Sequence, residues 1–348
     1  MGVSSSKPHP IETKWFPEFE TTLPSLEGKT VAITGTTSGT GFIVARTAIR
    51  KNAEHVLLLN RSSERSKASE QSLQDEARKV QSSSHVETIP CDLQDFASVR
   101  DAAQTIRSKY DKVHVLCNNA GIMAMEDKAT KDGYDVQMQT NHLSHFLLTQ
   151  QLYPLLKKAA ETSGQPSRVA NHSSGARNLP GTPAKVEYYG KNGGNLGGNS
   201  SSMLFGGARW ERYHQTKLAN LVFTNAFNER IAGSNNTSPK VWATCAEPGL
   251  SSTALQVTTA RNGGMGSGMW FMRFAQSAED GSMPILSACF SPEQETSKTT
   301  IWHPSKGMVG PAKQSPMSPK EVASKEGAND LLWTASEEAC GKFDPATE

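Results

Sequence analysis

Short apolar runs alternate with amphipathic stretches along most of the chain. The runs KTVAITG, HVLLLN and KVHVLCNNAG are rich in aliphatic residues and end at turn-forming residues, which predicts buried strands. The stretches between them, such as GFIVARTAIRKN and FASVRDAAQTIRSKY, carry apolar residues at helical spacing. The alternation continues through SRVANHSS, HQTKLANLVFTNAFNERI and VWATCAEPG. It predicts an α/β fold in which a doubly wound parallel sheet has helices on both faces.

Two segments depart from this rhythm. Residues 1–27 are rich in Ser and Pro and are expected to form an N-terminal arm, in which Trp15 and Phe16 can pack on a neighbouring surface. Residues 178–208 are crowded with Gly, Asn and Ser, which predicts a flexible insertion rather than a second domain. We expect residues 28–348 to form one domain, closed by helices in AEDGSMPILSACFS and EGANDLLWTASEEA.

Composition excludes several classes of protein. With 36% hydrophobic and 20% charged residues, the chain is typical of a soluble globular protein, and its longest apolar run is too short to cross a bilayer. A net charge of +2 argues against a nucleic-acid surface. The five cysteines are widely spaced and form no C-x-x-C pair, which favours free thiols in a reducing, cytoplasmic compartment.

The first residues match a lipidation motif. MGVSSSKPHP fits M-G-x-x-x-[S/T] with Gly2 as the acceptor and Ser6 in place, and it lacks the apolar core of a signal peptide. One myristoyl chain with the single charge of Lys7 would give only weak, reversible membrane association. The alternative is an unmodified polar terminus.

A glycine-rich turn follows the first expected strand. ITGTTSGTGF places Gly35, Gly39 and Gly41 in a T-G-x-x-x-G-x-G pattern related to the dinucleotide-binding G-x-G-x-x-G. Glycines at such a turn allow a pyrophosphate to approach the backbone and the N-terminus of the following helix. A turn with only a structural role is the alternative for the glycines alone.

The second expected strand ends in a basic residue. LLLNRSSE has Asn60 and Arg61 where an NAD-binding protein usually carries an acidic residue for the adenine ribose. A guanidinium can bind the extra phosphate of NADP in a bidentate way, so the sequence favours NADP(H). The alternative is that Arg61 belongs to a solvated loop.

Other polar motifs also follow expected strands. CDLQD ends the third strand with Asp92 and Leu93, and NNAG ends the fourth with Asn119, Ala120 and Gly121. In doubly wound sheets, ligands bind at the carboxyl ends of the strands, so these motifs are expected to surround one nucleotide.

A tyrosine precedes a lysine by one helical turn. Tyr213 and Lys217 therefore share a helix face, although Y-x-x-x-K also occurs in helices with no catalytic role. The histidines at 142, 145, 172 and 214 have no acidic or cysteine partners at ligand spacing, so no metal site is expected.

These motifs occur in an order that resembles the short-chain dehydrogenase/reductase family from residue 28 to the C-terminus. The branches most similar are the retinol-dehydrogenase-like and protochlorophyllide-reductase-like ones, and the fold implied is a Rossmann fold. The chain departs from the family pattern at Thr40, where an apolar residue is common, and in the long span between Ser174 and Tyr213. The motifs that carry the resemblance are TGTTSGTG at 34–41, NNAG at 118–121, Asn141, HSS at 172–174, Y-x-x-x-K at 213–217 and PGLSST at 248–253.

The resemblance implies catalytic roles for four residues. Tyr213 would be the general acid in carbonyl reduction and the base in alcohol oxidation, with its pKa lowered by Lys217 together with the positively charged nicotinamide of the oxidised cofactor. Lys217 would also bind the nicotinamide ribose, and Asn141 would hold a water that relays protons. Ser174 would stabilise the charge on the substrate oxygen, whereas its neighbour Ser173 is expected to point the other way.

The resemblance also implies a set of cofactor contacts and three competing functions. The preferred function is an NADP-dependent oxidoreductase, monomeric or homodimeric, acting on a small and apolar carbonyl or alcohol substrate. The alternatives are a non-catalytic NADP-binding sensor or scaffold and a light-driven reductase. The expected NADP(H) contacts are Gly35, Thr37, Ser38, Gly39, Thr40, Gly41, Arg61, Asp92, Leu93, Asn119, Ala120, Gly121, Tyr213, Lys217, Pro248, Gly249 and Thr253.

Overall fold

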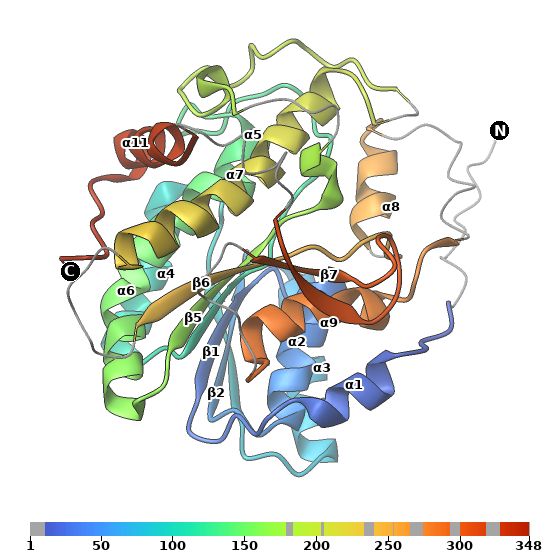
Figure 1. Ribbon diagram of the computed structural model, residues 1–348, viewed down its shortest axis with the longest axis vertical. Coiled ribbons are helices and arrows are strands. Elements are labelled where there is room, and N and C mark those ends of the chain that lie inside the picture. The colour runs from blue at the N-terminus through green and yellow to red at the C-terminus, as the bar shows by residue number, and fades with distance from the viewer. Residues whose placement is uncertain are drawn as a thin grey trace.

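One eight-stranded sheet runs through the computed structural model (Figure 1), which describes residues 11–178, 184–202, 205–232, 240–252, 254–264, 274–292, 300–317 and 328–347. The strand order is β3-β2-β1-β4-β5-β6-β7-β8, and all neighbours are parallel except β7 and β8. The strands are β1 (Thr30–Thr34), β2 (His55–Asn60), β3 (His85–Pro90), β4 (Val115–Asn118), β5 (Ser167–His172), β6 (Val241–Ala246), β7 (Thr300–Pro304) and β8 (Ala312–Pro316).

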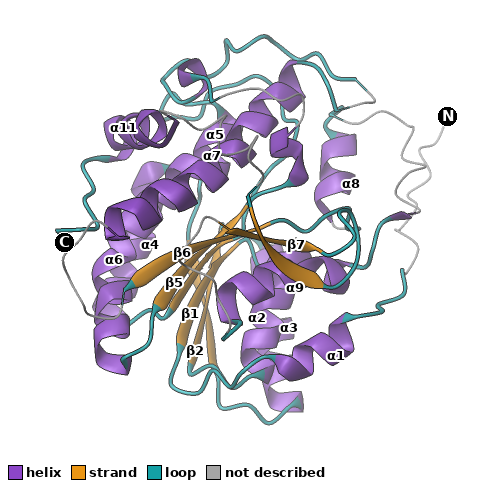
Figure 2. Cartoon of the chain, in the orientation of Figure 1, coloured by secondary structure: helices purple, strands orange, loops and turns teal. Residues whose placement is uncertain are grey.

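Helices cover both faces of the sheet (Figure 2). Along β2, Val56 and Leu58 join the apolar cluster on one face, while Leu57 and Leu59 join the cluster on the other. The first face carries α1 (Phe16–Thr22), α2 (Gly39–Arg50), α3 (Glu64–Lys79) and α9 (Ala278–Phe290). The second carries α4 (Phe96–Lys109), α6 (Ser144–Ser163), α7 (Ala208–Ala232) and α11 (Ala328–Cys340). Shorter helices are α5 (Val136–Met138), η1 (Gln139–Leu143), η2 (Gly175–Asn178), η3 (Val186–Tyr188) and α8 (Ala254–Arg261).

The doubly wound fold predicted from the sequence is confirmed, with two strands that the pattern did not predict. β7 is joined to β6 through one registered pair, Ala246 and Trp302, and β8 runs antiparallel at the edge of the sheet. The β8 sequence, AKQSP, is polar and half exposed, so it lacks the apolar run by which buried strands are recognised.

The N-terminal arm contains a short helix that docks on the first face. Phe16 of α1 is only 2% exposed, and it packs in the same apolar cluster as α9. The buried carboxylate of Asp280 accepts hydrogen bonds from three successive backbone N–H groups, those of residues 14–16, at 2.9 to 3.0 Å. The surface on which Trp15 and Phe16 were expected to pack therefore belongs to the same chain. The lipidation motif at Gly2 and Ser6 lies outside the described residues.

The described part of the Gly/Asn-rich insertion, residues 184–202 and 205–207, is irregular apart from the single turn η3. It is anchored to the domain by Arg212, whose buried guanidinium donates to the carbonyl oxygens of Leu196 and Gly198 at 2.9 and 2.8 Å. The carboxylate of Asp127 accepts hydrogen bonds from the backbone N–H groups of the same two residues. Both partners come from outside the insertion and hold it against α7.

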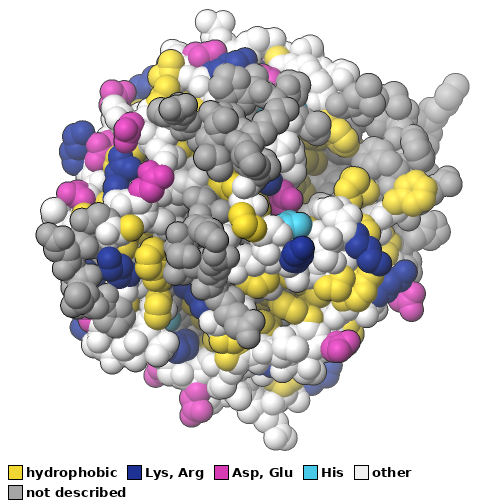
Figure 3. All heavy atoms as spheres, in the orientation of Figure 1, with side chains coloured by type: hydrophobic (Ala, Val, Ile, Leu, Met, Phe, Trp, Pro, Cys, Tyr) yellow, Lys and Arg dark blue, Asp and Glu magenta, His cyan; other side chains and the backbone are white. Residues whose placement is uncertain are grey.

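The face shown in Figure 3 carries basic and acidic side chains interspersed with one another, and the full sequence has a net charge of +2. Among the described helices, none has both the length and the apolar character needed to cross a lipid bilayer. All five cysteines are buried, and none of them forms a disulfide bond.

Candidate active site

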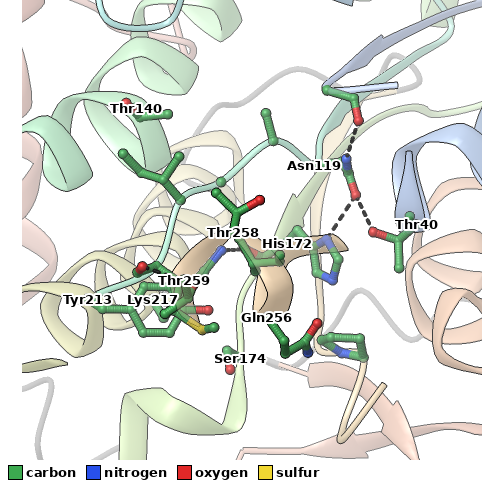
Figure 4. Close-up of a pocket in the computed structure, with 18 of the residues that line it drawn as sticks. Thr40, Asn119, Thr140, His172, Ser174, Tyr213, Lys217, Gln256, Thr258 and Thr259 are labelled. Carbon is green, nitrogen blue, oxygen red and sulfur yellow. Dashed lines mark hydrogen bonds between the residues drawn. The ribbon is translucent and has the colours of Figure 1, made fainter. Parts of the chain in front are cut away.

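A cleft of about 670 Å³ lies at the carboxyl ends of the strands, where the strand order reverses between β1 and β4 (Figure 4). It brings together nearly all of the residues that the sequence singled out. Those lining it are Gly35, Thr37, Ser38, Gly39, Thr40, Arg61, Asp92, Leu93, Asn119, Ala120, Gly121, Ser174, Tyr213, Lys217, Pro248 and Gly249. Thr253 lies outside the described residues, and Gly41 and Asn141 lie behind the wall of the cleft.

The glycine turn connects β1 to α2 at the floor of the cleft. Gly35 has a φ of +72°, and a Cβ atom there would lie 2.8 Å from the Cβ of Ala120. Only glycine fits this conformation and this contact without strain. Gly39 and Thr40, in the first turn of α2, line the cleft. The free N–H groups of this helix terminus are therefore close to whatever occupies the cleft.

Two guanidinium groups lie at the end of β2. Arg61 is exposed and lines the cleft, and Arg65, in the first turns of α3, donates a hydrogen bond of 2.6 Å to the hydroxyl of Ser38. Sequence reasoning found Arg61 and missed Arg65. The signal was available, because Arg65 follows Arg61 by four residues and α3 begins at Glu64. The pair offers a cationic site beside the glycine turn.

Tyr213 and Lys217 lie side by side on α7, on the cleft wall opposite the glycine turn (Figure 4). Lys217 Nζ donates to the carbonyl oxygen of His172 at 2.9 Å and lies 5.8 Å from the centre of the Tyr213 ring. Both Ser173 and Ser174 border the cleft, but their hydroxyls have different partners. The Ser173 hydroxyl donates to the backbone carbonyl of Lys217 at 2.7 Å, whereas the Ser174 hydroxyl forms a hydrogen bond with Tyr213.

Burial dominates the electrostatics of this pair. It raises the pKa of Tyr213 to about 12, against an opposing effect of hydrogen bonding by Ser174, and it lowers the pKa of Lys217 to about 8. The expected lowering of the Tyr213 pKa included the charge of the oxidised nicotinamide, and with Lys217 alone beside the phenol the effect of burial dominates. The Lys217 ammonium donates to the His172 carbonyl, and desolvation of the phenol is the largest effect on the pKa of Tyr213. At neutral pH Tyr213 therefore holds its proton and Lys217 is mostly charged.

Asn141 lies in the π-helical turn η1, a local widening that often occurs at functional sites. Its side chain is fully buried, with Oδ1 accepting from the N–H of Ile122 at 2.8 Å and Nδ2 donating to the Ile122 carbonyl and to the Thr216 hydroxyl at 2.9 Å. A Cβ atom on Gly121 would lie 3.3 Å from Asn141 Oδ1 and 3.4 Å from Lys217 Nζ. Asn141 thus fixes the chain beside Lys217.

An ion pair that the sequence did not suggest supports Ser174. Glu247 lines the cleft after β6 and pairs with Arg177, which donates a hydrogen bond of 2.8 Å to the backbone carbonyl of Ser174. Both side chains are mostly buried, so the pair ties the end of β6 to the turn that carries Ser174. Glu247 directly precedes the PG motif, but nothing in the sequence pairs it with Arg177.

Apolar side chains line the cleft beside Tyr213, together with polar ones from α8 (Figure 4). The apolar residues are Met123, Met125, Phe205, Trp210 and Leu255, and the polar ones are Gln256, Thr258 and Thr259. Residues 265–273, a Met- and Trp-rich segment, lie outside the described residues, and of the two residues that follow, Phe274 is exposed and Ala275 is buried. Within the described chain, no group of three His, Cys, Asp or Glu residues could hold a metal ion.

Comparisons with known proteins agree with this architecture. Residues 29–189 match the family model described as short chain dehydrogenase. An uncharacterized oxidoreductase of Schizosaccharomyces pombe is 34% identical over 60% of this chain and 58% of its own length. A short chain dehydrogenase of Arthrobotrys oligospora is 33% identical over 63% of this chain and 68% of its own, and human retinol dehydrogenase 13 is 30% identical over 69% and 64%.

The chain matches only part of several relatives but nearly all of one solved structure. It spans 58, 54 and 51% of the length of three fungal relatives, so their whole activities do not transfer directly. A crystal structure of an uncharacterized protein from Mycobacterium paratuberculosis matches with a TM-score of 0.68 and 27% identity over 96% of this chain and 99% of that one. From its fold, its motifs and these relatives, the chain belongs to the short-chain dehydrogenase family, on the retinol-dehydrogenase-like branch.

Proposed function

We propose that the protein is an NADP-dependent oxidoreductase that interconverts a carbonyl group and an alcohol on a small, apolar substrate. The observation that carries the proposal is the meeting of Ser174, Tyr213 and Lys217 in one cleft with the glycine turn and two arginines. A protein that only binds a nucleotide has no need of a buried phenol and an ammonium group beside it.

The residues of the cleft fit a dinucleotide with an extra phosphate. The glycine turn and the first turn of α2 suit a pyrophosphate, while Arg61 and Arg65 suit a phosphate on the adenine ribose. No carboxylate takes the place of Arg61 at the end of β2, where an NAD-specific protein would use one. When bound, the nicotinamide would supply or accept the hydride.

Tyr213 would handle the proton. Because its raised pKa keeps the phenol protonated at neutral pH, Tyr213 is ready to donate its proton to a carbonyl oxygen during reduction and to take it back during oxidation. The hydroxyl of Ser174 would donate a hydrogen bond to the same oxygen as negative charge develops there. Lys217 would place a positive charge one helical turn away, which favours the phenolate left after proton transfer.

The apolar wall supports an apolar substrate. Met123, Trp210 and Leu255 lie on the substrate side of Tyr213, and they offer few hydrogen-bonding groups to a polar ligand. The human relative is named for retinol, an apolar alcohol. Methionine side chains adapt to the shape of a ligand, so the wall suits a class of substrates better than one rigid molecule.

The experiment for the function is oxidation of NADPH and of NADH with a panel of aldehydes, ketones and quinones. We expect turnover with NADPH and a lower KM for NADPH than for NADH. Arg65→Ala should raise the KM for NADPH by about tenfold or more, since a charge-assisted hydrogen bond is worth about 1.5–3 kcal/mol. The same change should leave the KM for NADH unchanged. The matched control is Arg78→Ala, an exposed arginine at the far end of the same helix. A wild-type preference for NADH would contradict the assignment of the cofactor.

A further inference from the structure

His172 is a histidine on the wall of the cleft with no assigned role. It is the last residue of β5, it is 7% exposed, and its ring lies beside Asn119 on the wall of the cleft (Figure 4). Its backbone carbonyl accepts hydrogen bonds from Lys217 Nζ at 2.9 Å and from Asn220 Nδ2 at 3.0 Å. The residue therefore borders the catalytic lysine directly.

The neighbouring amide shows which ring nitrogen carries the hydrogen. Asn119 Nδ2 donates to the carbonyl oxygens of Thr34 and Gly35, at 3.0 and 3.3 Å, so the other end of its amide is the oxygen. This oxygen accepts from the hydroxyl of Thr40 at 2.7 Å and lies 3.0 Å from Nδ1 of His172. A carbonyl oxygen can only accept, so Nδ1 of His172 must donate.

The second ring nitrogen is left as an acceptor without a partner. Burial and the nearby charge of Lys217 lower the pKa of His172 to about 3, so the ring is neutral at physiological pH. With the hydrogen on Nδ1, the Nε2 atom bears a lone pair. Nε2 is buried and has no hydrogen-bond partner among the described residues. Buried acceptors are nearly always paired, so a missing donor is the simplest explanation.

We propose that Nε2 of His172 accepts a hydrogen bond from the nicotinamide–ribose half of the bound cofactor and thereby positions that half in the cleft. This inference rests on the proposed function. A donor is available there in two places, the ribose hydroxyls and the carboxamide NH₂. The nicotinamide–ribose half is assigned to this part of the cleft because of Lys217. Lys217 donates a hydrogen bond to the His172 carbonyl, and it is the residue assigned to the nicotinamide ribose.

The hydrogen-bond network makes His172 a suitable positioning residue. Hydrogen bonds join Thr40 in the glycine turn to Asn119, and Asn119 to the ring of His172 (Figure 4). The backbone carbonyl of the same His172 accepts a hydrogen bond from Lys217. The ring is held on one side by Nδ1 and packed in the wall, so its acceptor is fixed before the cofactor arrives. A group held in this way orients a ligand at little entropic cost.

The first test uses the wild-type protein labelled with ¹⁵N-histidine. Its long-range ¹H–¹⁵N spectrum should show His172 as the neutral tautomer protonated at Nδ1, with an Nε2 resonance that moves when NADPH is added. The resonance is assigned by its loss in His172→Asn. An Nε2 resonance that stays fixed while NADPH binds would overturn the inference and leave the proposed function intact, as would a water molecule that pairs with Nε2 in both states. Absence of any cofactor binding would overturn both.

The second test separates the acceptor from the packing. In His172→Asn the side-chain amide can replace the Nδ1 donor but not the Nε2 acceptor, whereas the Gln side chain in His172→Gln can reach the Nε2 position. We expect the Kd for NADPH to rise about five- to tenfold in His172→Asn and to change less than about twofold in His172→Gln. Equal losses in the two variants would refute the role of Nε2.

A cofactor analogue distinguishes the two donors. The 3-acetylpyridine analogue of NADP keeps the ribose hydroxyls and lacks the carboxamide NH₂. If the ribose is the donor, His172→Asn should weaken binding of the analogue as much as binding of the natural cofactor. If the carboxamide is the donor, the wild type and the variant should bind the analogue equally.

Discussion

Replacing Lys217 with methionine should make the cofactor-free protein more stable at neutral pH. Lys217 is 4% exposed, and burial lowers its pKa from 10.5 to about 8. A lysine pKa that falls by this amount on folding means that the charged form destabilises the native state by about 3 kcal/mol. Methionine has a similar length and carries no charge. The His172 carbonyl would keep its second donor, Asn220 Nδ2, in the variant.

The pH dependence gives the sharper form of this prediction. Below pH 8 the lysine is charged in both the folded and the unfolded wild type, so the full penalty applies. Between pH 8 and 10.5 the folded protein loses this proton before the unfolded chain does, so wild-type stability rises with pH. The stability advantage of Lys217→Met should therefore shrink by about 2 kcal/mol between pH 7 and pH 9.5.

Urea denaturation followed by tryptophan fluorescence measures this difference, because the other titrating groups cancel between wild type and variant. The matched control is Lys67→Met, which removes an exposed lysine of α3 instead of a buried one. A difference between Lys217→Met and wild type that is the same at pH 7 and pH 9.5 would show that Lys217 is not a desolvated cation. It would remove the basis for the electrostatics described for the site.

Two further predictions compare neighbouring residues. Ser174→Ala should lower kcat by about 100-fold, as loss of a donor to the developing oxyanion does, whereas Ser173→Ala should mainly lower stability by about 1 kcal/mol because its hydroxyl bonds to α7. Steady-state kinetics and urea denaturation of both variants check this, and equal kcat losses would contradict it. Asp280→Ala should lower the free energy of unfolding by about 2 kcal/mol, because three backbone N–H groups of the arm lose their acceptor. Glu279→Ala, which breaks a partly exposed ion pair with Arg46, should cost less than about 1 kcal/mol, and an equal loss in both would refute the capping role.

Much of the fold could be predicted because the central strands are buried on both faces. Strands such as β1 and β2 are continuous apolar runs, which occur in few other settings. β8 could not be predicted, since its residues are polar and its pairing depends on an adjacent strand rather than on its own pattern. The anchoring of the insertion also escaped prediction, because it depends on the meeting of Arg212 with Asp127, far apart in the chain.

The residues of the candidate site likewise divide into those that the sequence could predict and those that it could not. Residues at strand ends could be predicted as a group, since parallel strands bring their carboxyl ends to one edge. The contribution of Glu247 could not, because it depends on Arg177 crossing from a neighbouring turn. The raised pKa of Tyr213 in the cofactor-free site could not be predicted, because spacing along a helix reports the distance to Lys217 and says nothing of the depth of burial, which is the largest effect on this pKa.

The general-acid role of Tyr213 is tested most directly by Tyr213→Phe, which removes one hydroxyl from the cleft. The matched control is Tyr189→Phe, at a buried tyrosine outside the cleft. The measurement is kcat with the best carbonyl substrate, alongside the Kd for NADPH of the same preparations. We expect Tyr213→Phe to keep NADPH binding within about twofold and to lose at least about 100-fold in kcat, while Tyr189→Phe keeps both. Full turnover by Tyr213→Phe with NADPH bound would contradict the account.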